Sequence, residues 1–211
     1  MSIEATPPAR SLSLPIVIFG SLGMAFAWVL TPSYGPWVAN AAVAIPTLLA
    51  AFIWGETARS LQLGLRASAL AVAIGLALVF ASWLLAGPLV RAFPWLGREL
   101  TQLYATLNRP PGPLKALPIL LLTAATEEVV WRGELVSWLR LRCGSALTVI
   151  IATFAYSLPI AASQSPLLFA VASGLGAVFT LERLLTNSWV APLITHAIWA
   201  VGVFVAQPPL Q

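Results

Sequence analysis

Three glutamates and an arginine interrupt an apolar run of the sequence that begins near Leu117. They are Glu127, Glu128, Arg132 and Glu134. An ionisable side chain at the centre of a bilayer costs about 2.5–3.5 kcal/mol, so such groups are rare unless they pair or face a wet cavity. On a helix, Glu128 and Arg132 stand four residues apart and are predicted to form an ion pair. Glu127 then has no counter-charge on its own helix, which makes it a candidate general base.

The helical period predicts a second stripe of the same helix, which carries Glu127, Trp131 and Glu134. The alternative interpretation is that the charges mark the end of a membrane span, where water solvates all of them. We favour a functional site, because the charged residues lie within the apolar run.

The single histidine of the chain, His196, lies in the middle of another apolar segment, from Trp189 to Ala206. A histidine inside a membrane span is costly and marks a site more often than one in a soluble core. We predict that its partner is a glutamate of the helix from Leu117 to Arg140.

The composition restricts the class of protein. Of the 211 residues, 59% are hydrophobic and only 9% are charged, whereas a soluble domain carries about 25% charged residues. So few charges cannot cover a water-facing surface, which excludes a soluble enzyme, a disordered protein and a coiled coil. We attribute the net charge of +4 to loop arginines rather than to a nucleic-acid partner. The single cysteine, Cys143, excludes an internal disulfide.

The predicted fold is an all-α polytopic membrane bundle of about seven transmembrane helices, in a single transmembrane domain over residues 1–211. A spanning helix needs about 20 mostly apolar residues. The candidate spans run from about Leu14 to Leu30, Trp37 to Trp54, Ala67 to Val90, Leu117 to Arg140, Ala146 to Ala162, Pro166 to Leu185 and Trp189 to Ala206. We expect the first to be a retained anchor rather than a cleaved signal peptide.

The loop charges favour a cytoplasmic N-terminus, with six cationic residues in the inside segments against four outside. All four outside residues lie in the loop from Arg91 to Lys115. The apolar spacing in this loop suits a short amphipathic helix at the membrane interface. An ordinary ordered connector is the alternative.

Several segments resemble the CPBP family, the CAAX-processing and bacteriocin-processing intramembrane proteases also called the Abi family. Residues 127–133 (EEVVWRG) resemble the E-E-x-x-x-R motif of that family. Residues 63–66 (LGLR), 181–183 (LER) and 187–197 (NSWVAPLITHA) are similar to further family segments, the last of which leads into a catalytic histidine. The resemblance divides the domain into two N-terminal spans, residues 1–62, and a CPBP-like catalytic core, residues 63–206.

The resemblance implies a mechanism of peptide hydrolysis. Glu127 would activate a water to attack the scissile carbonyl, and Glu128 with Arg132 would hold the charge geometry of the site. His196 would orient the water or polarise the carbonyl. Such a reaction needs a base, a water and stabilisation of the oxyanion, shielded from lipid.

The sequence departs from the family pattern at two positions. Leu158 stands where the family usually carries a second histidine, and Ala200 stands where it often carries an asparagine. Substitute donors are available, but we expect each of them to bond to its own helix backbone or a neighbouring loop. These residues are Tyr156, Ser157, Gln164 and Thr195.

The donor set favours a mechanism without a metal or other cofactor. A catalytic zinc usually takes three protein ligands, and this chain offers His196 with Glu127 and Glu128 at best. Adjacent residues of a helix point about 100° apart, which suits chelation poorly. A zinc-dependent protease is the alternative.

We therefore predict an intramembrane endopeptidase of the bacterial inner membrane that cleaves a membrane-tethered protein or lipidated peptide near its anchor. Two alternatives stay open. One is a family member that has lost catalysis and acts as a binding or chaperone-like membrane protein, which Leu158 and Ala200 favour. The other is a small transporter with an intramembrane Glu/Arg pair, although the sequence has no inverted repeat.

Overall fold

The computed structural model describes residues 12–55 and 62–206, and every regular element within these ranges is a helix. The prediction of an all-α membrane bundle is confirmed. The elements are α1 (Ser13–Tyr34), α2 (Pro36–Trp54), α3 (Leu65–Ala92), α4 (Pro94–Leu107), α5 (Leu117–Glu128), the π-helical segment η2 (Val129–Leu135), α6 (Val136–Arg140), α7 (Ser145–Ser157), the 3₁₀ segment η3 (Pro159–Ser163), α8 (Pro166–Thr186), α9 (Val190–Val201) and the π-helical segment η4 (Gly202–Ala206).

Five helical segments of the described chain are long and apolar enough to cross a membrane. They are Ser13–Tyr34, Pro36–Trp54, Leu65–Ala92, Ser145–Ser163 and Pro166–Thr186. The predicted count of about seven is not confirmed, because Val190–Ala206 is shorter and α5 is followed directly by the charged η2 and α6. The chain is an integral membrane protein with two further apolar helices that carry the ionisable residues.

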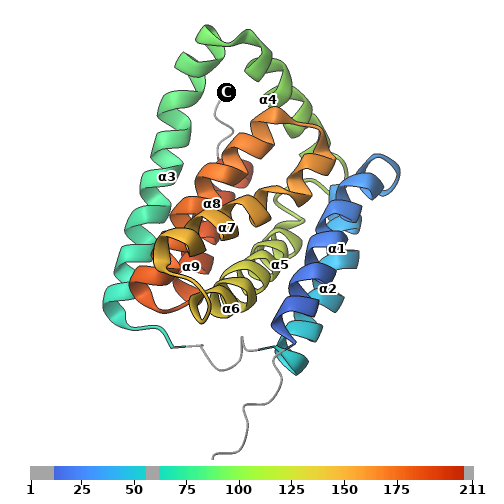
Figure 1. The fold of residues 1–211 in the computed structure, drawn as a ribbon. Coiled ribbons are helices and arrows are strands. Elements are labelled where there is room, and N and C mark those ends of the chain that lie inside the picture. Colours follow the sequence, from blue (N-terminus) through green and yellow to red (C-terminus); the bar gives the residue numbers. More distant parts are fainter. Residues whose placement is uncertain (1–11, 56–61, 207–211) are drawn as a thin grey trace, which may run out of the picture.

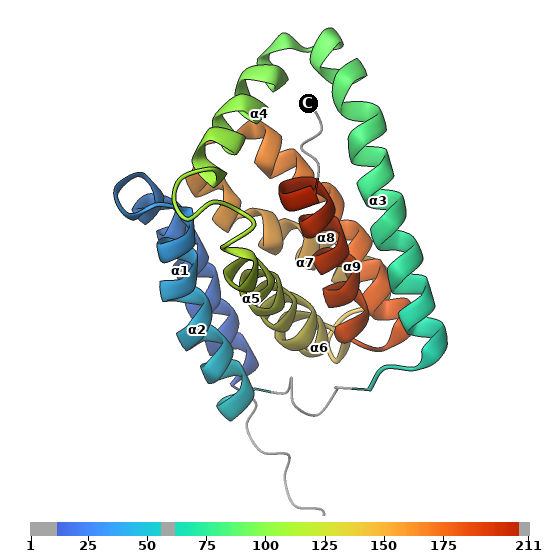
Figure 2. The same cartoon turned by 180° about the vertical axis from the view of Figure 1, so that it is seen from behind.

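The helices form a bundle in which α1 and α2 pair on one side and α3 lies on the opposite side (Figures 1 and 2). The run from α5 to α6 lies between them, together with α7, α8 and α9. Proline at the first turn starts α2, α4, α5 and α8, where its missing N–H has no helical partner to lose. The charged stretch of the sequence is thereby placed at the centre of the bundle.

The corner between α1 and α2 is fixed by a residue from the loop after α4. Gly35 joins the two helices with a φ of 79°, a left-handed conformation that favours glycine. Arg109 Nη1 donates to the carbonyls of Thr31 (2.8 Å) and Pro32 (3.2 Å) at the end of α1. A cation at this position satisfies the last carbonyls of the helix and its dipole.

The close approach of α3 to α9 depends on Gly75. A Cβ atom at Gly75 would lie 2.9 Å from Ile198 Cβ and 3.2 Å from the carbonyl oxygen of Thr195. Any larger residue would push apart the two helices, and α9 is the helix that carries His196.

The loop from Arg91 to Lys115, for which the sequence leaves an amphipathic helix and an ordinary connector open, contains the helix α4. The helix begins at Pro94 and ends at Leu107. Leu96, Leu100 and Leu103 from α4 line a cavity of the protein, so this apolar face packs over other helices of the chain.

Candidate active site

The ionisable residues of the E-E-x-x-x-R segment lie where the α-helix changes to a π-helix. α5 ends at Glu128, and η2 runs from Val129 to Leu135 with all seven residues buried. A π-helix bonds residue i to i+5, and single π turns inside α-helices are frequent at functional sites. The wider turn changes the direction in which the side chains after Glu128 point.

The predicted stripe through Glu127, Trp131 and Glu134 is therefore wrong at its last member. Glu127 faces α7, where it meets Tyr156, and the Trp131 ring packs edge-on against the same tyrosine. Glu134 instead accepts a hydrogen bond from Ser13 of α1. The spacing i, i+7 returns to one face only at 3.6 residues per turn, and the π-helical segment breaks that period.

Glu128 is the centre of the buried polar cluster. Its Oε1 atom lies 3.1 Å from Arg132 Nη1 and 2.9 Å from His196 Nδ1. Glu128 and Arg132 have no exposed surface, and His196 is 7% exposed. Both sequence predictions are confirmed here: the Glu128–Arg132 ion pair, and a glutamate of this helix as the partner of His196. Removal of any member would leave a buried charge or donor without its partner.

Glu127 is bound differently from its neighbour. Its Oε2 atom accepts a hydrogen bond of 2.8 Å from the Tyr156 hydroxyl, and its side chain is half-buried rather than enclosed. No salt bridge to Glu127 occurs among the described residues. Two adjacent carboxylates thus have different partners: a cation and an imidazole for Glu128, and a neutral hydroxyl for Glu127.

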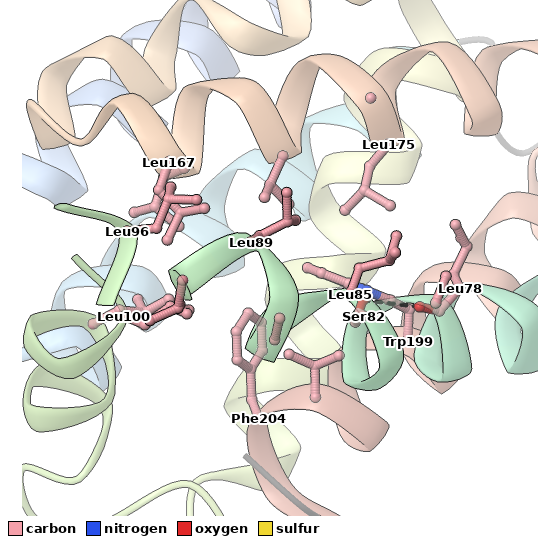
Figure 3. A pocket seen from close by; sticks show the side chains of 18 of the residues that line it. Leu78, Ser82, Leu85, Leu89, Leu96, Leu100, Leu167, Leu175, Trp199 and Phe204 are labelled. Atoms are coloured by element: carbon pink, nitrogen blue, oxygen red, sulfur yellow. Dashed lines mark hydrogen bonds between the residues drawn. The ribbon is translucent and has the colours of Figure 1, made fainter. Parts of the chain in front are cut away.

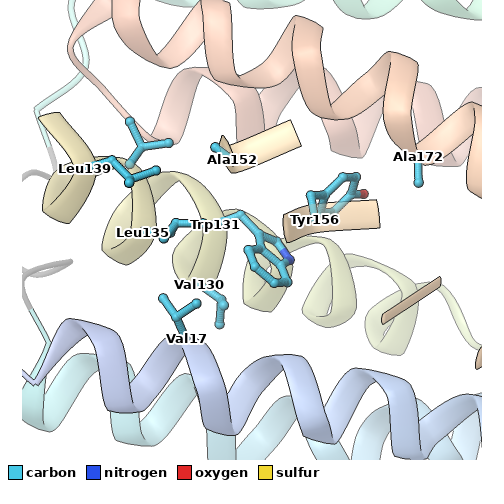
Figure 4. Packing of buried hydrophobic residues seen from close by; sticks show 9 residues of the cluster. Val17, Val130, Trp131, Leu135, Leu139, Ala152, Tyr156 and Ala172 are labelled. Atoms are coloured by element: carbon cyan, nitrogen blue, oxygen red, sulfur yellow. The ribbon is translucent and has the colours of Figure 1, made fainter. Parts of the chain in front are cut away.

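Packing on α7 and α8 fixes Arg132. The guanidinium lies 4.5 Å from the centre of the Tyr156 ring and 5.1 Å from that of Phe179, distances at which the ring faces attract a cation. Arg132 Nη2 also donates to the carbonyl of Gly176 (3.2 Å). Figure 4 shows Tyr156 and Trp131 within the hydrophobic cluster that joins α1, η2 and α7.

His196 is held between aromatic rings. Its imidazole stacks on Phe179, with ring centres 5.0 Å apart and planes 28° apart, and Trp199 lies 6.2 Å away. Because Nδ1 faces the Glu128 carboxylate, the tautomer with a proton on Nδ1 suits this contact, and Nε2 is then the basic nitrogen of the ring. The stacking and the hydrogen bond to Glu128 together determine the ring's orientation.

A further buried carboxylate, Glu182, lies on α8. Glu182 Oε1 accepts from the Thr195 hydroxyl at 2.8 Å, and the same hydroxyl lies 3.0 Å from the carbonyl of Ala71. Sequence reasoning placed Thr195 among the possible donors but did not single out Glu182. The signal that could have found it was a glutamate within an apolar span, four residues before the end of α8.

The four possible substitute donors have different surroundings. Tyr156 contacts Glu127 and Thr195 contacts Glu182, so the expectation of purely local bonding is wrong for these two. Ser157 donates to the carbonyl of Thr153 on its own helix, as expected, but its hydroxyl also lies 3.0 Å from that of Ser173 on α8. Gln164 ends η3 in a left-handed conformation with a φ of 57°.

The two positions that depart from the family pattern lie in different environments. Leu158 is 51% exposed and follows α7. Two residues before it, Tyr156 is buried against Glu127, and residues two apart on a helix point to nearly opposite sides. Ala200 is buried in the cluster that contains Phe179 and Trp199.

Several buried polar atoms of the cluster have no hydrogen-bond partner within the described ranges. They include Glu128 Oε2, Arg132 Nε and Glu182 Oε2. Among the described residues, no three His, Cys, Asp or Glu side chains are grouped so that they could hold a metal ion. The buried polar side chains therefore have hydrogen-bonding capacity that no described residue uses.

The fold and the charge cluster describe an integral membrane protein with an ionisable centre inside its helical bundle. Residues 110–202 match the family model "Type II CAAX prenyl endopeptidase Rce1-like", and this segment contains Glu127, Glu128, Arg132 and His196. The match is consistent with a member of the CPBP/CAAX protease family and confirms the resemblance drawn from the motifs. No curated protein and no solved structure matches the chain.

Proposed function

We propose that this protein is an intramembrane endopeptidase in which Glu127 activates a water molecule to hydrolyse a peptide bond. The observation that carries the proposal is the asymmetry of the two adjacent glutamates. Glu128 is engaged by Arg132 and His196. Among the described residues, the hydrogen-bond partner of Glu127 is the neutral Tyr156 hydroxyl, and part of the Glu127 side chain stays accessible. A general base needs both a carboxylate and access to water.

In the proposed reaction, the Glu127 carboxylate takes a proton from a water as the water oxygen attacks the scissile carbonyl carbon. A negative charge then develops on the carbonyl oxygen. Arg132 is the nearby group that can donate to it, and donors already fixed in a low-dielectric site stabilise such a charge strongly. The unprotonated Nε2 of His196 can accept a hydrogen bond from the attacking water and orient it. When the carbon–nitrogen bond breaks, Glu127 returns the proton to the leaving amine.

Tyr156 acts as a positioning residue in this proposal. Its hydroxyl donates to Glu127 Oε2, and its ring supports the Arg132 guanidinium. The same side chain therefore orients the base and the cation. Tyr156 lies two residues before Leu158, the position at which the family usually carries a histidine.

The proposed substrate is a membrane-tethered protein or lipidated peptide, cleaved near its anchor. The buried cluster is supported by helices that are apolar enough to span the membrane, so a peptide bond would have to reach it from within or beside the bilayer. We propose that the reaction takes place in the bacterial inner membrane, with Glu127, Glu128, Arg132 and His196 as its site residues and without a metal.

The test is cleavage of membrane proteins from the same host in liposomes by the wild type and by Glu127→Ala, with the products mapped by mass spectrometry. Cleavage that is lost in Glu127→Ala and survives a chelator supports the proposal. Loss with the chelator and recovery with a divalent metal would favour a metalloprotease. If the folded wild type cleaves nothing, the binding function favoured by Leu158 and Ala200 replaces the proposal.

A further inference from the structure

A cavity of about 410 Å³ lies beside the candidate site, between α3, α4, α8 and the end of α9 with η4. Figure 3 shows leucines from three of these helices pointing toward one another, with Trp199 and Phe204 from the C-terminal part. The volume falls in the range of about 300–1,000 Å³ that is typical of ligand pockets. Trp199 lines this cavity and also contacts the ring of His196.

The apolar lining of the cavity suits a hydrocarbon ligand. Only two lining side chains, Ser82 and Tyr104, carry a hydroxyl, and both hydroxyls are already bonded within the protein. Ser82 donates to the carbonyl of Leu78 and accepts from Trp199 Nε1. Tyr104 donates to the carbonyl of Val203, and burial raises the pKa of its phenol well above the usual value, so the group stays neutral. A polar ligand would find no partner in this cavity.

Two unpaired arginines flank the end of the cavity formed by α3 and α4. Arg91 follows the lining residue Val90, and Arg98 lies between the lining residues Leu96 and Leu100. Both arginines are exposed, and neither forms a salt bridge with another described residue. The single acidic residue of α4, Glu99, is occupied by a hydrogen bond from Ser165 Oγ. This corner of the protein therefore carries net positive charge.

We propose that the cavity binds one acyl chain of an anionic phospholipid from the surrounding bilayer, with the phosphate held near Arg91 and Arg98. The apolar lining accounts for the chain, and the two arginines account for the charge of the headgroup. The Glu99–Ser165 and Tyr104–Val203 hydrogen bonds hold α4 over the bound chain. This lipid site is independent of the proposed protease activity, because its ligand is a bilayer component and its measurement does not require cleavage.

Gly174 is a position at which a side chain can be added inside the cavity. It lines the cavity, and an added Cβ atom would meet no other atom within 4 Å. Gly64 is the matched control, because it also has open space for a Cβ atom and is exposed before the start of α3. Gly174→Phe and Gly64→Phe therefore add the same side chain inside and outside the cavity.

The test uses the full chain reconstituted with phosphatidylglycerol and phosphatidylcholine of matched acyl chains, then extracted in mild detergent for native mass spectrometry. The wild type and Gly64→Phe are expected to retain one phosphatidylglycerol. Gly174→Phe is expected to lower the retained fraction about tenfold, since displacing about two buried methylene groups costs that much affinity. Gly174→Leu serves as a smaller filling variant if the phenylalanine prevents folding.

The headgroup part of the proposal is tested by Arg91→Gln with Arg98→Gln. The preference for phosphatidylglycerol over phosphatidylcholine should fall about fivefold for each arginine removed. The control pair, Arg66→Gln with Arg142→Gln, removes two exposed arginines from elsewhere on the chain and should keep the preference.

Three results would overturn the lipid site: a wild type that retains no phospholipid, equal retention by Gly174→Phe and Gly64→Phe, or equal retention of the two lipids by the wild type. If only a lipidated peptide occupies the cavity, the first of these results is obtained. A protein that retains the lipid but cleaves nothing would refute the proposed function and leave the lipid site intact.

Discussion

The regions on the two sides of Trp199 differ in polarity. On one side, Glu128, Arg132 and His196 form a buried polar cluster with short, specific contacts. On the other side, leucines and valines from four helical regions enclose a cavity with no unbonded hydroxyl in its lining. The polar cluster depends on each partner being present, whereas the cavity depends only on volume and apolarity.

This difference follows from the energetics of burial. A buried ion pair that loses one member leaves an uncompensated charge, which costs several kcal/mol. An apolar cavity wall can change shape at a much lower cost when its volume is nearly conserved. Substitutions on the two sides should therefore differ in the size of their effect.

The largest expected loss of stability is in Glu128→Ala. It leaves Arg132 and His196 buried without their shared carboxylate, so the free energy of unfolding should fall by about 3–5 kcal/mol. Denaturant unfolding in detergent micelles measures this change. Glu128→Gln keeps a hydrogen-bond acceptor and should lose less. A Glu128→Ala protein as stable as the wild type would show that the cluster is not a structural unit.

Phe179→Leu should have a smaller effect, with a loss of about 0.5–1.5 kcal/mol for its aromatic contacts. Phe179 is fully buried and supports both the His196 ring and the Arg132 guanidinium. Val171→Leu is the matched change on the cavity face of the same helix α8 and should cost less than Phe179→Leu. Thermal unfolding of both variants measures the two losses of stability. A larger loss in Val171→Leu than in Phe179→Leu would contradict the expected difference between the polar cluster and the cavity.

Tyr156→Phe isolates one hydrogen bond of the site. It removes the hydroxyl that donates to Glu127 Oε2 and keeps the ring beneath Arg132. Because this hydrogen bond fixes the orientation of Glu127, the turnover rate should fall about tenfold or more. A Tyr156→Phe enzyme with wild-type turnover would remove Tyr156 from the proposed mechanism.

Leu158→His should have the smallest effect, although it restores the residue type that the family usually carries there. The side chain at this position is 51% exposed and lies on the side of α7 away from Glu127. We expect turnover within about twofold of the wild type, because a histidine pointing away from the site cannot reach a water bound there. A clear gain in turnover would show that α7 rotates in the working enzyme.

The sequence predicted the elements of the fold well and the directions of side chains less well. Apolar segments located each long helix to within a few residues at most ends, because a bilayer imposes a minimum length on every span. The Glu128–Arg132 pair followed from helical spacing alone. The direction of Glu134 did not, because the π-helical segment departs from the α-helical period and the hydrophobic pattern of the sequence does not indicate it.

Contacts between helices were the other part that the sequence could not provide. In the sequence, Tyr156 is one of several polar residues, and only the structure shows that its hydroxyl reaches Glu127 on another helix. Glu182 was noted only as part of a short segment, and its contact with Thr195 joins α8 to α9. Such pairs depend on which helices are neighbours, and a single sequence holds no record of that arrangement.

The central claim is that Glu127 is the reactive glutamate and that Glu134 of the same helical run is structural. Glu127→Gln and Glu134→Gln make the same change at two positions of one helical run, one facing Tyr156 and the other bound to Ser13 of α1. The direct measurement compares the single-turnover cleavage rate and the melting temperature of these two variants on a substrate identified with the wild type. The account predicts that Glu127→Gln loses about 10²–10⁴-fold in rate at a nearly unchanged melting temperature, and that Glu134→Gln keeps its rate at a lowered melting temperature. Equal losses of rate in the two variants, or a Glu127→Gln protein that still cleaves at the wild-type rate, would contradict it.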